Sequence, residues 1–120
     1  MIESIDHVQL AAPAGCEAKA RRFFGELIGL EEIGKPVALR SRGGVWFRCG
    51  EQELHVGVEP DFRPARKAHP AFRARALDEL RTRLEEAGST TRDDTEVPAG
   101  IRRFYVEDPW GNRLEFVEAA

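Results

Sequence analysis

The sequence predicts an α+β fold in which two βαβββ modules, residues 3–58 and 69–118, are joined by a connector, residues 59–68. Two observations lead to this prediction. The order strand, helix, strands restarts after the connector, and histidines occupy corresponding places in the two halves. His7 and His69 open the halves, 22 and 19 positions before the glycine that ends each predicted helix. Two such modules related by a pseudo-twofold axis would form a curved mixed sheet around a cavity, with the helices on its outer face.

The first module is predicted to begin with a strand over residues 4–11, in which Val8 and Leu10 face the core. A helix over residues 16–28 follows, because its apolar residues recur at helical spacing, and Gly29 suits a helix C-terminus. Three strands complete the module, at residues 37–40, 45–49 and 53–58.

The second module repeats this order after the connector. A strand is predicted over residues 69–75 and a helix over 77–87, which Gly88 ends. The helix residues expected to face inward are Leu77, Leu80, Leu84 and Ala87. Residues 90–95 form either a short strand or a loop, and two strands, 101–107 and 113–118, are joined by a tight turn over 108–112.

The last strand carries a carboxylate in an unusual place. Side chains alternate between the faces of a strand, so Leu114 and Phe116 share the core face while Glu115 points the other way. In an open sheet such a residue is a solvated surface carboxylate. The alternative is a functional role, which depends on what the rest of the chain brings near it.

Composition and charge exclude several classes of protein. At 120 residues the chain is predicted to be one domain, residues 1–120, with 42% hydrophobic and 32% charged residues. No apolar run approaches the roughly 20 residues that a membrane span needs. A net charge of -3 with interleaved signs argues against nucleic-acid binding, and the N-terminal residues show no secretory signal, so we expect a cytoplasmic protein. Cys16 and Cys49 are not assigned any chemistry.

All three histidines fall on matching positions of the repeat. His7 pairs with His69, 48 positions separate His7 from His55, and 46 separate His69 from Glu115. Imidazole nitrogen and carboxylate oxygen are ligands for Zn, Ni, Mn, Co or Fe. These four side chains are therefore the candidate ligands of a divalent metal ion. Glu53 shares the strand face of His55 and is an alternative fourth ligand, while Pro70 leaves the direction of the His69 side chain open.

The whole chain, from residue 3 to 118, resembles the vicinal oxygen chelate (VOC) superfamily, which includes glyoxalase I, bleomycin and fosfomycin resistance proteins and extradiol dioxygenases. The resemblance rests on DHVQL at the start, ELHV, AHPAF and YVEDPWGNRLEFVE at the end. The last segment, with its DP-x-GN-x-LE pattern, is the most specific. The resemblance implies that His7, His69 and Glu115 take the three shared metal positions and that His55 takes the fourth. It also implies a small-molecule substrate and a homodimer.

The resemblance implies a glyoxalase-like lyase or isomerase in which the metal acts as a Lewis acid on a substrate with neighbouring oxygens. Glu115 is the candidate base if it can leave the metal, and Glu53 is its substitute. The Tyr105 hydroxyl is a candidate donor to an oxyanion; the alternative is that its ring only packs against an arginine. The alternatives are an extradiol-type Fe(II) dioxygenase and a resistance protein that binds an antibiotic or metabolite without turnover. Trp46, Phe47 and Phe62 either line an apolar pocket or pack in the core. Arg63, Arg66 and Lys67 either attract an anionic substrate or are ordinary solvated side chains.

Overall fold

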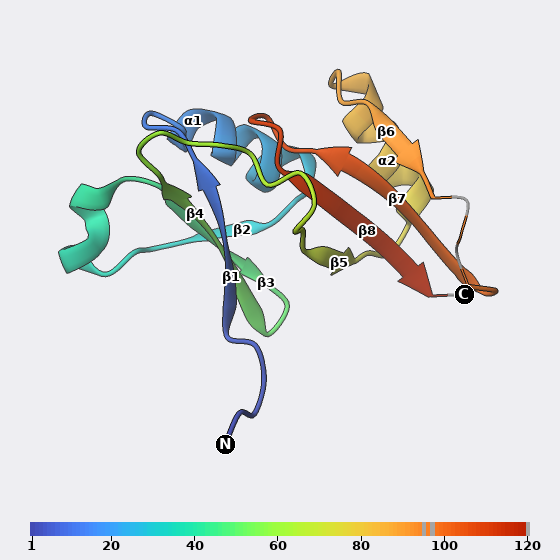
Figure 1. Cartoon of the computed structure of the whole chain (residues 1–120), viewed down its shortest axis with the longest axis horizontal. Helices are drawn as coiled ribbons and strands as arrows, with labels where there is room; N and C mark the ends of the chain where they lie inside the picture. The colour runs from blue at the N-terminus through green and yellow to red at the C-terminus, as the bar shows by residue number, and fades with distance from the viewer. Residues whose placement is uncertain (95, 97, 120) are drawn as a thin grey trace. The chain divides into compact units, whose positions relative to one another are not determined.

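The computed structural model describes residues 1–94, 96 and 98–119. It contains two compact units, Met1–Pro64 and Ala65–Ala120, each of which is described by itself. Each unit has the order strand, helix, three strands and forms its own four-stranded mixed sheet (Figure 1). The predicted α+β fold with two βαβββ modules is confirmed.

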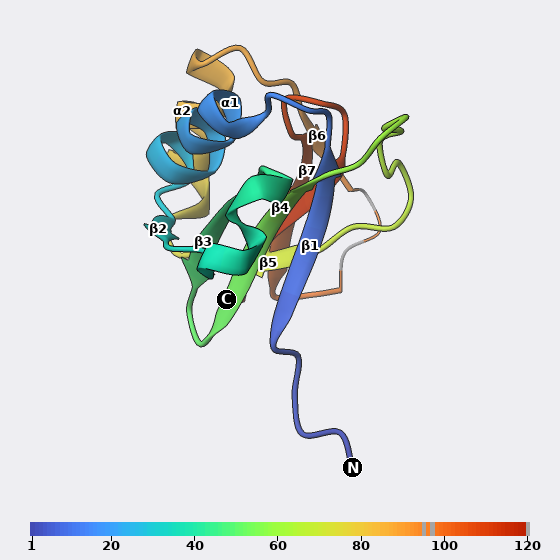
Figure 2. The ribbon, with the colours of Figure 1, turned by 90° about the vertical axis from the view of Figure 1, so that its left-hand side faces the viewer.

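The first unit contains a sheet with the strand order β1-β4-β3-β2 (Figure 2). β1 pairs with β4 in parallel, and the other neighbours are antiparallel. The strands are β1 (His7–Ala12), β2 (Glu31–Ile33), β3 (Val45–Cys49) and β4 (Gln52–Val58), and the helical segments are α1 (Glu17–Ala20), η1 (Arg21–Leu27) and η2 (Val37–Arg42). β1 begins three residues later than predicted.

The core of the first unit lies between the helix and one face of this sheet. Phe24 contacts Phe23 edge to face and lies 5.9 Å, between ring centroids, from Phe47 on β3. All three rings are buried, and burial of such a side chain contributes about 1.5–3 kcal/mol. Phe47 is therefore a core residue and not a pocket wall. The predicted helix is present but changes from α to π geometry at Arg21, and it ends before Gly29, whose φ is +91°.

The strand predicted at residues 37–40 is wrong. This stretch is the 3₁₀ helix η2, which follows Pro36, and the side chain of Val37 is 75% exposed. The strand of this region is β2, whose register pairs Glu32 with Phe47 and Ile33 with Trp46. Two glutamates and one isoleucine have little intrinsic preference for a strand, so the sequence signal of β2 is weak. The strand forms because it pairs with β3.

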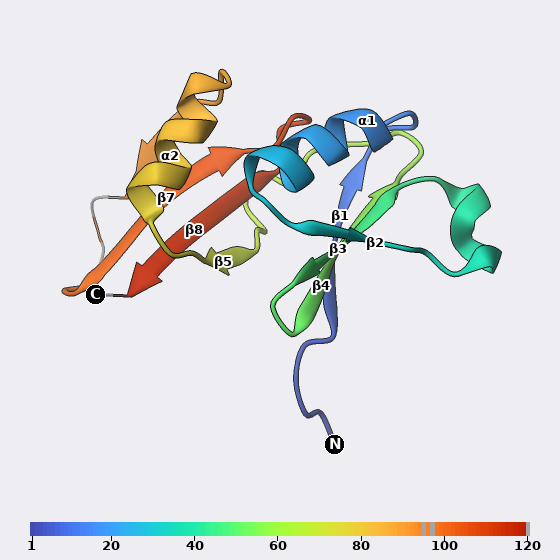
Figure 3. The ribbon, with the colours of Figure 1, turned by 180° about the vertical axis from the view of Figure 1, so that it is seen from behind.

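The second unit contains a sheet with the order β5-β8-β7-β6, and α2 lies across one face of it (Figure 3). Its elements are β5 (Ala71–Arg73), α2 (Leu77–Glu86), β6 (Thr91–Asp93), β7 (Ile101–Glu107) and β8 (Arg113–Ala119). β5 is parallel to β8 and shorter than the predicted strand over 69–75, since Pro70 has no N–H to donate.

The helix α2 buries Leu77 and Leu84, whereas Ala87 is exposed, so its predicted inward position is wrong. Ala87 lies just beyond the last helical residue, where the chain turns into Gly88 with a φ of +100°. The ambiguous segment 90–95 contains the strand β6, and Thr95 lies outside the described residues. Among the helices described, none is long and apolar enough to cross a bilayer.

Gly44 precedes β3 at a position that only glycine suits. Its φ is +90°, and a Cβ atom there would meet the carbonyl oxygen of Val56 at 2.2 Å. We expect Gly44→Ala to lower the free energy of unfolding by about 2–3 kcal/mol, measured by urea denaturation. Gly50 also has a positive φ, +61°, but a Cβ there would meet nothing within 4 Å in the described part of the chain. Gly50→Ala should cost about 1 kcal/mol, and equal losses would contradict the role of the close contact.

Candidate functional site

The candidate ligands of the first unit, His7 and His55, lie together on the open face of its sheet. The register of β1 and β4 pairs His7 with Glu53, and His55 is the next residue on that face. The two imidazole rings stack with centroids 4.2 Å apart, and Nε2 of His55 lies 2.9 Å from Oε1 of Glu53. His55 is only 4% exposed. Its other neighbour is Trp46, whose indole stacks on the imidazole at 3.7 Å and an interplanar angle of 2°.

The candidate ligands of the second unit, His69 and Glu115, also lie together. Nε2 of His69 is 3.1 Å from Oε1 of Glu115, and Glu115 is 7% exposed, so a solvated surface carboxylate is the wrong description of it. The backbone explains the direction of His69. The N–H of Glu115 donates to the carbonyl of Pro70 at 3.1 Å, which holds the segment before β5 beside β8. Pro70 therefore does not turn His69 away.

The protonation of His69 follows from its second contact. Nδ1 lies 2.8 Å from the backbone carbonyl of Lys67, which can only accept, so Nδ1 carries the hydrogen. Nε2 and the Glu115 carboxylate oxygen, 3.1 Å apart, are then both acceptors unless a hydrogen or a cation lies between them. A histidine whose Nδ1–H is bound to a carbonyl is a typical metal ligand through Nε2.

The described residues do not form a complete metal site. Over residues 1–94, 96 and 98–119, no three His, Cys, Asp or Glu side chains are grouped closely enough to hold a metal ion. His7, His55 and Glu53 lie in the first unit, and His69 and Glu115 lie in the second. Nitrogen and carboxylate oxygen are suitable donors for a divalent transition metal, so the chemistry of the four side chains fits such an ion.

Tyr105 lies opposite Glu115 in the register of β7 and β8, but its hydroxyl donates to Oδ2 of Asp94 at 3.2 Å. Arg103 donates to the same oxygen at 2.7 Å and lies 3.8 Å from Oε2 of Glu115. The guanidinium of Arg113 lies over the Tyr105 ring, 4.2 Å from its centroid. Burial, together with the charge of Glu115, raises the pKa of Tyr105 above its ordinary value of 10.0. The phenol is therefore neutral and able to donate at physiological pH.

Tyr105 is the only tyrosine of the chain, so its ionisation can be followed directly by phenolate absorbance. We expect a midpoint above pH 10, because burial and the Glu115 charge both disfavour the phenolate. Glu115→Gln should lower the midpoint, whereas Glu118→Gln, on the other face of β8, should leave it unchanged. A midpoint at or below 10 in the native protein would contradict this picture.

The turn before β8 fixes the connector that carries His69. The Asp108 carboxylate accepts from the N–H of Trp110 and of Asn112 and from Nδ2 of Asn112, at 2.7–3.0 Å. Oδ1 of Asn112 accepts from the N–H of Ala65 at 2.9 Å, and the N–H of Arg113 donates to the carbonyl of Ala65 at 2.9 Å. The turn motif thereby holds the chain four residues before His69.

Sequence reasoning did not identify Asp94 or the stacking role of Trp46. Asp94 is in the segment that the pattern left ambiguous, and its contacts depend on the pairing of β6 with β7. The register of β3 with β4 places Trp46 beside His55, which only the hairpin geometry could have indicated. The basic residues of the connector, Arg63, Arg66 and Lys67, are exposed, and the ring of Phe62 is half-buried.

Comparisons with known proteins agree on the fold. The sequence model of the Glyoxalase/Bleomycin resistance protein/Dioxygenase superfamily matches residues 4–116. A Bacillus anthracis crystal structure classed with the glyoxalase family is 54% identical, with a TM-score of 0.95, and the match covers 100% of this chain and 98% of that one. Lactoylglutathione lyase from Agrobacterium tumefaciens is 26% identical, with a TM-score of 0.72 and coverage of 98% and 94%.

A third structure shows a likeness of fold alone. It is the fosfomycin resistance protein FosX from Listeria monocytogenes, as its E126Q mutant with Mn(II) and 1S,2S-dihydroxypropylphosphonic acid. It is 19% identical, with a TM-score of 0.81, and the match covers 100% of this chain and 95% of that one. The comparison with curated proteins gives no match.

Proposed function

Because the chain belongs to the Glyoxalase/Bleomycin resistance protein/Dioxygenase superfamily, we propose that it is a divalent-metal-dependent enzyme of the glyoxalase type. In this proposal it acts on a small molecule with two neighbouring oxygen atoms, as a lyase or isomerase. The likeness to lactoylglutathione lyase supports this class of reaction. The observation that carries the proposal is the contact between the buried Glu115 carboxylate and Nε2 of His69, whose Nδ1–H is already bound to a backbone carbonyl.

The proposed ligands are His7, His55, His69 and Glu115, and Glu53 is the alternative to His55. Each imidazole–carboxylate contact, His69 with Glu115 and His55 with Glu53, brings a nitrogen and an oxygen donor within about 3 Å of each other. A cation can replace the proton between two such donors, because both atoms carry lone pairs directed at the shared space. A bound divalent ion would supply Lewis-acid polarisation of a substrate oxygen.

The chain's own residues supply proton transfer and orientation. Glu115 is the proposed base: released from the metal, its carboxylate would take a proton from a carbon beside a substrate carbonyl and return it to the neighbouring carbon. Arg103 places a positive charge 3.8 Å from Oε2 of Glu115. Tyr105 stays neutral because its pKa is raised, and its O–H, which donates to Asp94 in the structure, would exchange that partner for the oxygen on which charge develops.

The test is reconstitution of the metal-stripped protein with single metals under nitrogen and in air. Isomerisation of the hemithioacetal of a 2-oxoaldehyde and glutathione to the 2-hydroxyacyl thioester with Zn, Ni, Mn or Co, independent of oxygen, is the expected result. Activity that requires both Fe(II) and oxygen would replace the proposal with a dioxygenase. Tight binding of a metabolite with no turnover under any metal would replace it with a binding protein.

A further inference from the structure

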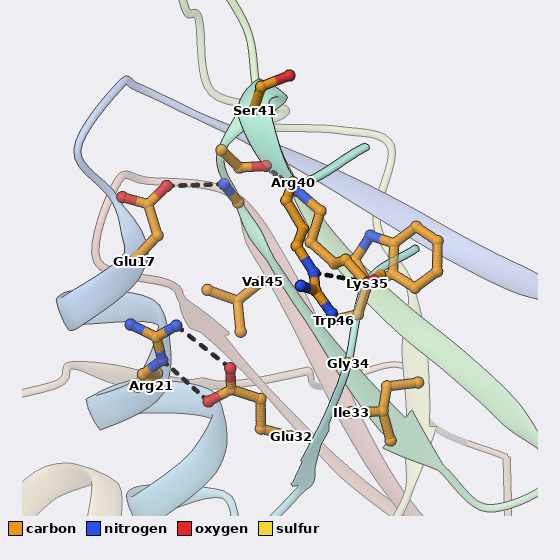
Figure 4. Close-up of a pocket in the computed structure, with 12 residues that line it drawn as sticks. Glu17, Arg21, Glu32, Ile33, Gly34, Lys35, Arg40, Ser41, Val45 and Trp46 are labelled. Atoms are coloured by element: carbon orange, nitrogen blue, oxygen red, sulfur yellow. Dashed lines mark hydrogen bonds and ion pairs between the residues drawn. The ribbon is translucent and has the colours of Figure 1, made fainter. Parts of the chain in front are cut away.

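A pocket of about 440 Å³ lies in the first unit (Figure 4). It is lined by the loop between β2 and β3, by the start of β3, and by Glu17 and Arg21 of the helix. None of the candidate ligands His7, His55 and Glu53 lines it. A volume of this size is in the range of small-molecule binding sites.

The carboxylates of this pocket are already engaged. Glu32 accepts two hydrogen bonds from Arg21, at 2.9 and 3.2 Å. Oε2 of Glu17 accepts from the N–H of Gly44 at 2.7 Å, and this contact lowers the pKa of Glu17. On this wall of the pocket, the negative charges are therefore compensated by donors from the chain itself.

The cations on the other wall lack such compensation. Lys35 donates through Nζ to the carbonyl of Gly43, and Nε of Arg40 donates to the carbonyl of Lys35 at 3.3 Å. Within the part of the chain that the structure describes, neither side chain has a carboxylate partner. A carbonyl uses only one of the donors of an ammonium or guanidinium group, so both retain N–H groups for a ligand.

The remaining lining sets the shape of a suitable ligand. Ile33 and Trp46, which are partners in the register of β2 and β3, supply apolar surface on the same face of the sheet. Figure 4 shows Lys35, Arg40 and Trp46 close together on one side, with Val45 between them and the helix. We propose that this pocket binds a small organic carboxylate, whose anionic group contacts Lys35 and Arg40 and whose apolar body lies against the cross-strand neighbours Ile33 and Trp46.

The pocket is also connected to the candidate ligands. The Trp46 indole that lines it stacks on His55 at 3.7 Å, and His55 stacks on His7. Binding in the pocket is therefore expected to be sensed by the His55 ring. The site itself uses none of the proposed metal ligands, so it does not rest on the proposed function.

Benzoate is the probe, and benzamide is its uncharged counterpart of nearly the same shape. Both are titrated into the isotopically labelled protein at constant ionic strength with a chelator present, and amide and indole N–H shifts are recorded. We expect saturable shifts at Gly43, Gly44 and the Trp46 indole with benzoate, and at least about tenfold weaker binding of benzamide.

Arg40→Gln should weaken benzoate binding by roughly tenfold or more, because it removes a charged donor from the pocket. Arg42→Gln is the matched control, since Arg42 is on the same 3₁₀ helix but does not line the pocket. Lys35→Gln is a second variant, and its stability is checked first because Lys35 also holds the loop through Gly43.

Equal shifts with benzoate and benzamide would overturn the proposal, as would equal weakening by Arg40→Gln and Arg42→Gln, or shifts spread over exposed arginines elsewhere. Because the titration is done with a chelator, a failure of benzoate to bind would not affect the metal proposal. A failure to bind metal would likewise not affect the proposed carboxylate site.

Discussion

Glu115→Gln is expected to lower the affinity for the activating metal by more than about 100-fold and to abolish turnover. The substitution keeps the size of a side chain that is 7% exposed and removes its charge and one donor oxygen. Loss of groups that merely support a ligand already costs 10–100-fold in metal affinity, so loss of a ligand costs at least as much. Isothermal titration of the metal-stripped protein measures the affinity, and the reconstituted activity measures turnover.

The matched control is Glu118→Gln on the same strand. Glu118 pairs with Arg102 at 3.1 Å near the surface, and such a pair contributes at most about 1 kcal/mol to stability. This variant removes the same charge without touching His69 or Tyr105, so its metal affinity should equal that of the native protein. If both variants lose affinity equally, the effect is one of net charge and the role of Glu115 is refuted.

Asp108→Ala should lower the free energy of unfolding by about 3–5 kcal/mol, measured by chemical denaturation. The carboxylate is 5% exposed and satisfies three N–H donors of the turn, from Trp110 and Asn112. Each buried donor left without a partner costs about 1–3 kcal/mol, and relaxation of the turn recovers part of the sum. Asn112, itself 1% exposed, would then no longer be fixed against Ala65.

Glu107→Ala is the control for this prediction, because Glu107 is the exposed residue next to Asp108 and a surface substitution changes stability by about 0.5 kcal/mol or less. A loss below 1 kcal/mol in Asp108→Ala would show that the turn forms without its hydrogen bonds. The aspartate of the DP-x-GN-x-LE pattern would then not be needed to stabilise the turn.

Segments with a strong local signal were predicted well. β3, Val45–Cys49, was predicted at its observed bounds, because alternating apolar residues are bounded by glycines on both sides. β7 was predicted equally well from its aromatic and β-branched residues. β2 was missed, since Glu31 and Glu32 have no strand preference and only pairing with β3 makes them a strand. The 3₁₀ helix after Pro36 was missed for a different reason: the β-branched Val37 favours a strand, but it is exposed and marks no core face.

Some contacts of the candidate side chains could also be predicted from the sequence, and others could not. The repeat arithmetic predicted that His7, His55, His69 and Glu115 point together as one set of ligands. Within the second unit His69 lies 3.1 Å from Glu115, and within the first the rings of His7 and His55 stack. That all four bind one ion stays a prediction. The hydrogen bond of Tyr105 to Asp94 was not predicted, because it depends on the position of a loop residue after a strand of only three residues.

The measurement that tests the central claim most directly is elemental analysis of the protein purified without chelator or affinity tag, beside His7→Ala and Glu115→Gln. One substitution lies in each unit, so the pair asks whether both donor pairs supply ligands to one ion. The proposal predicts one divalent metal ion per chain in the native protein and none in either variant, with unchanged circular dichroism. A native protein that contains no metal, and takes up none after incubation with Zn, Ni, Mn, Co or Fe(II), would contradict it.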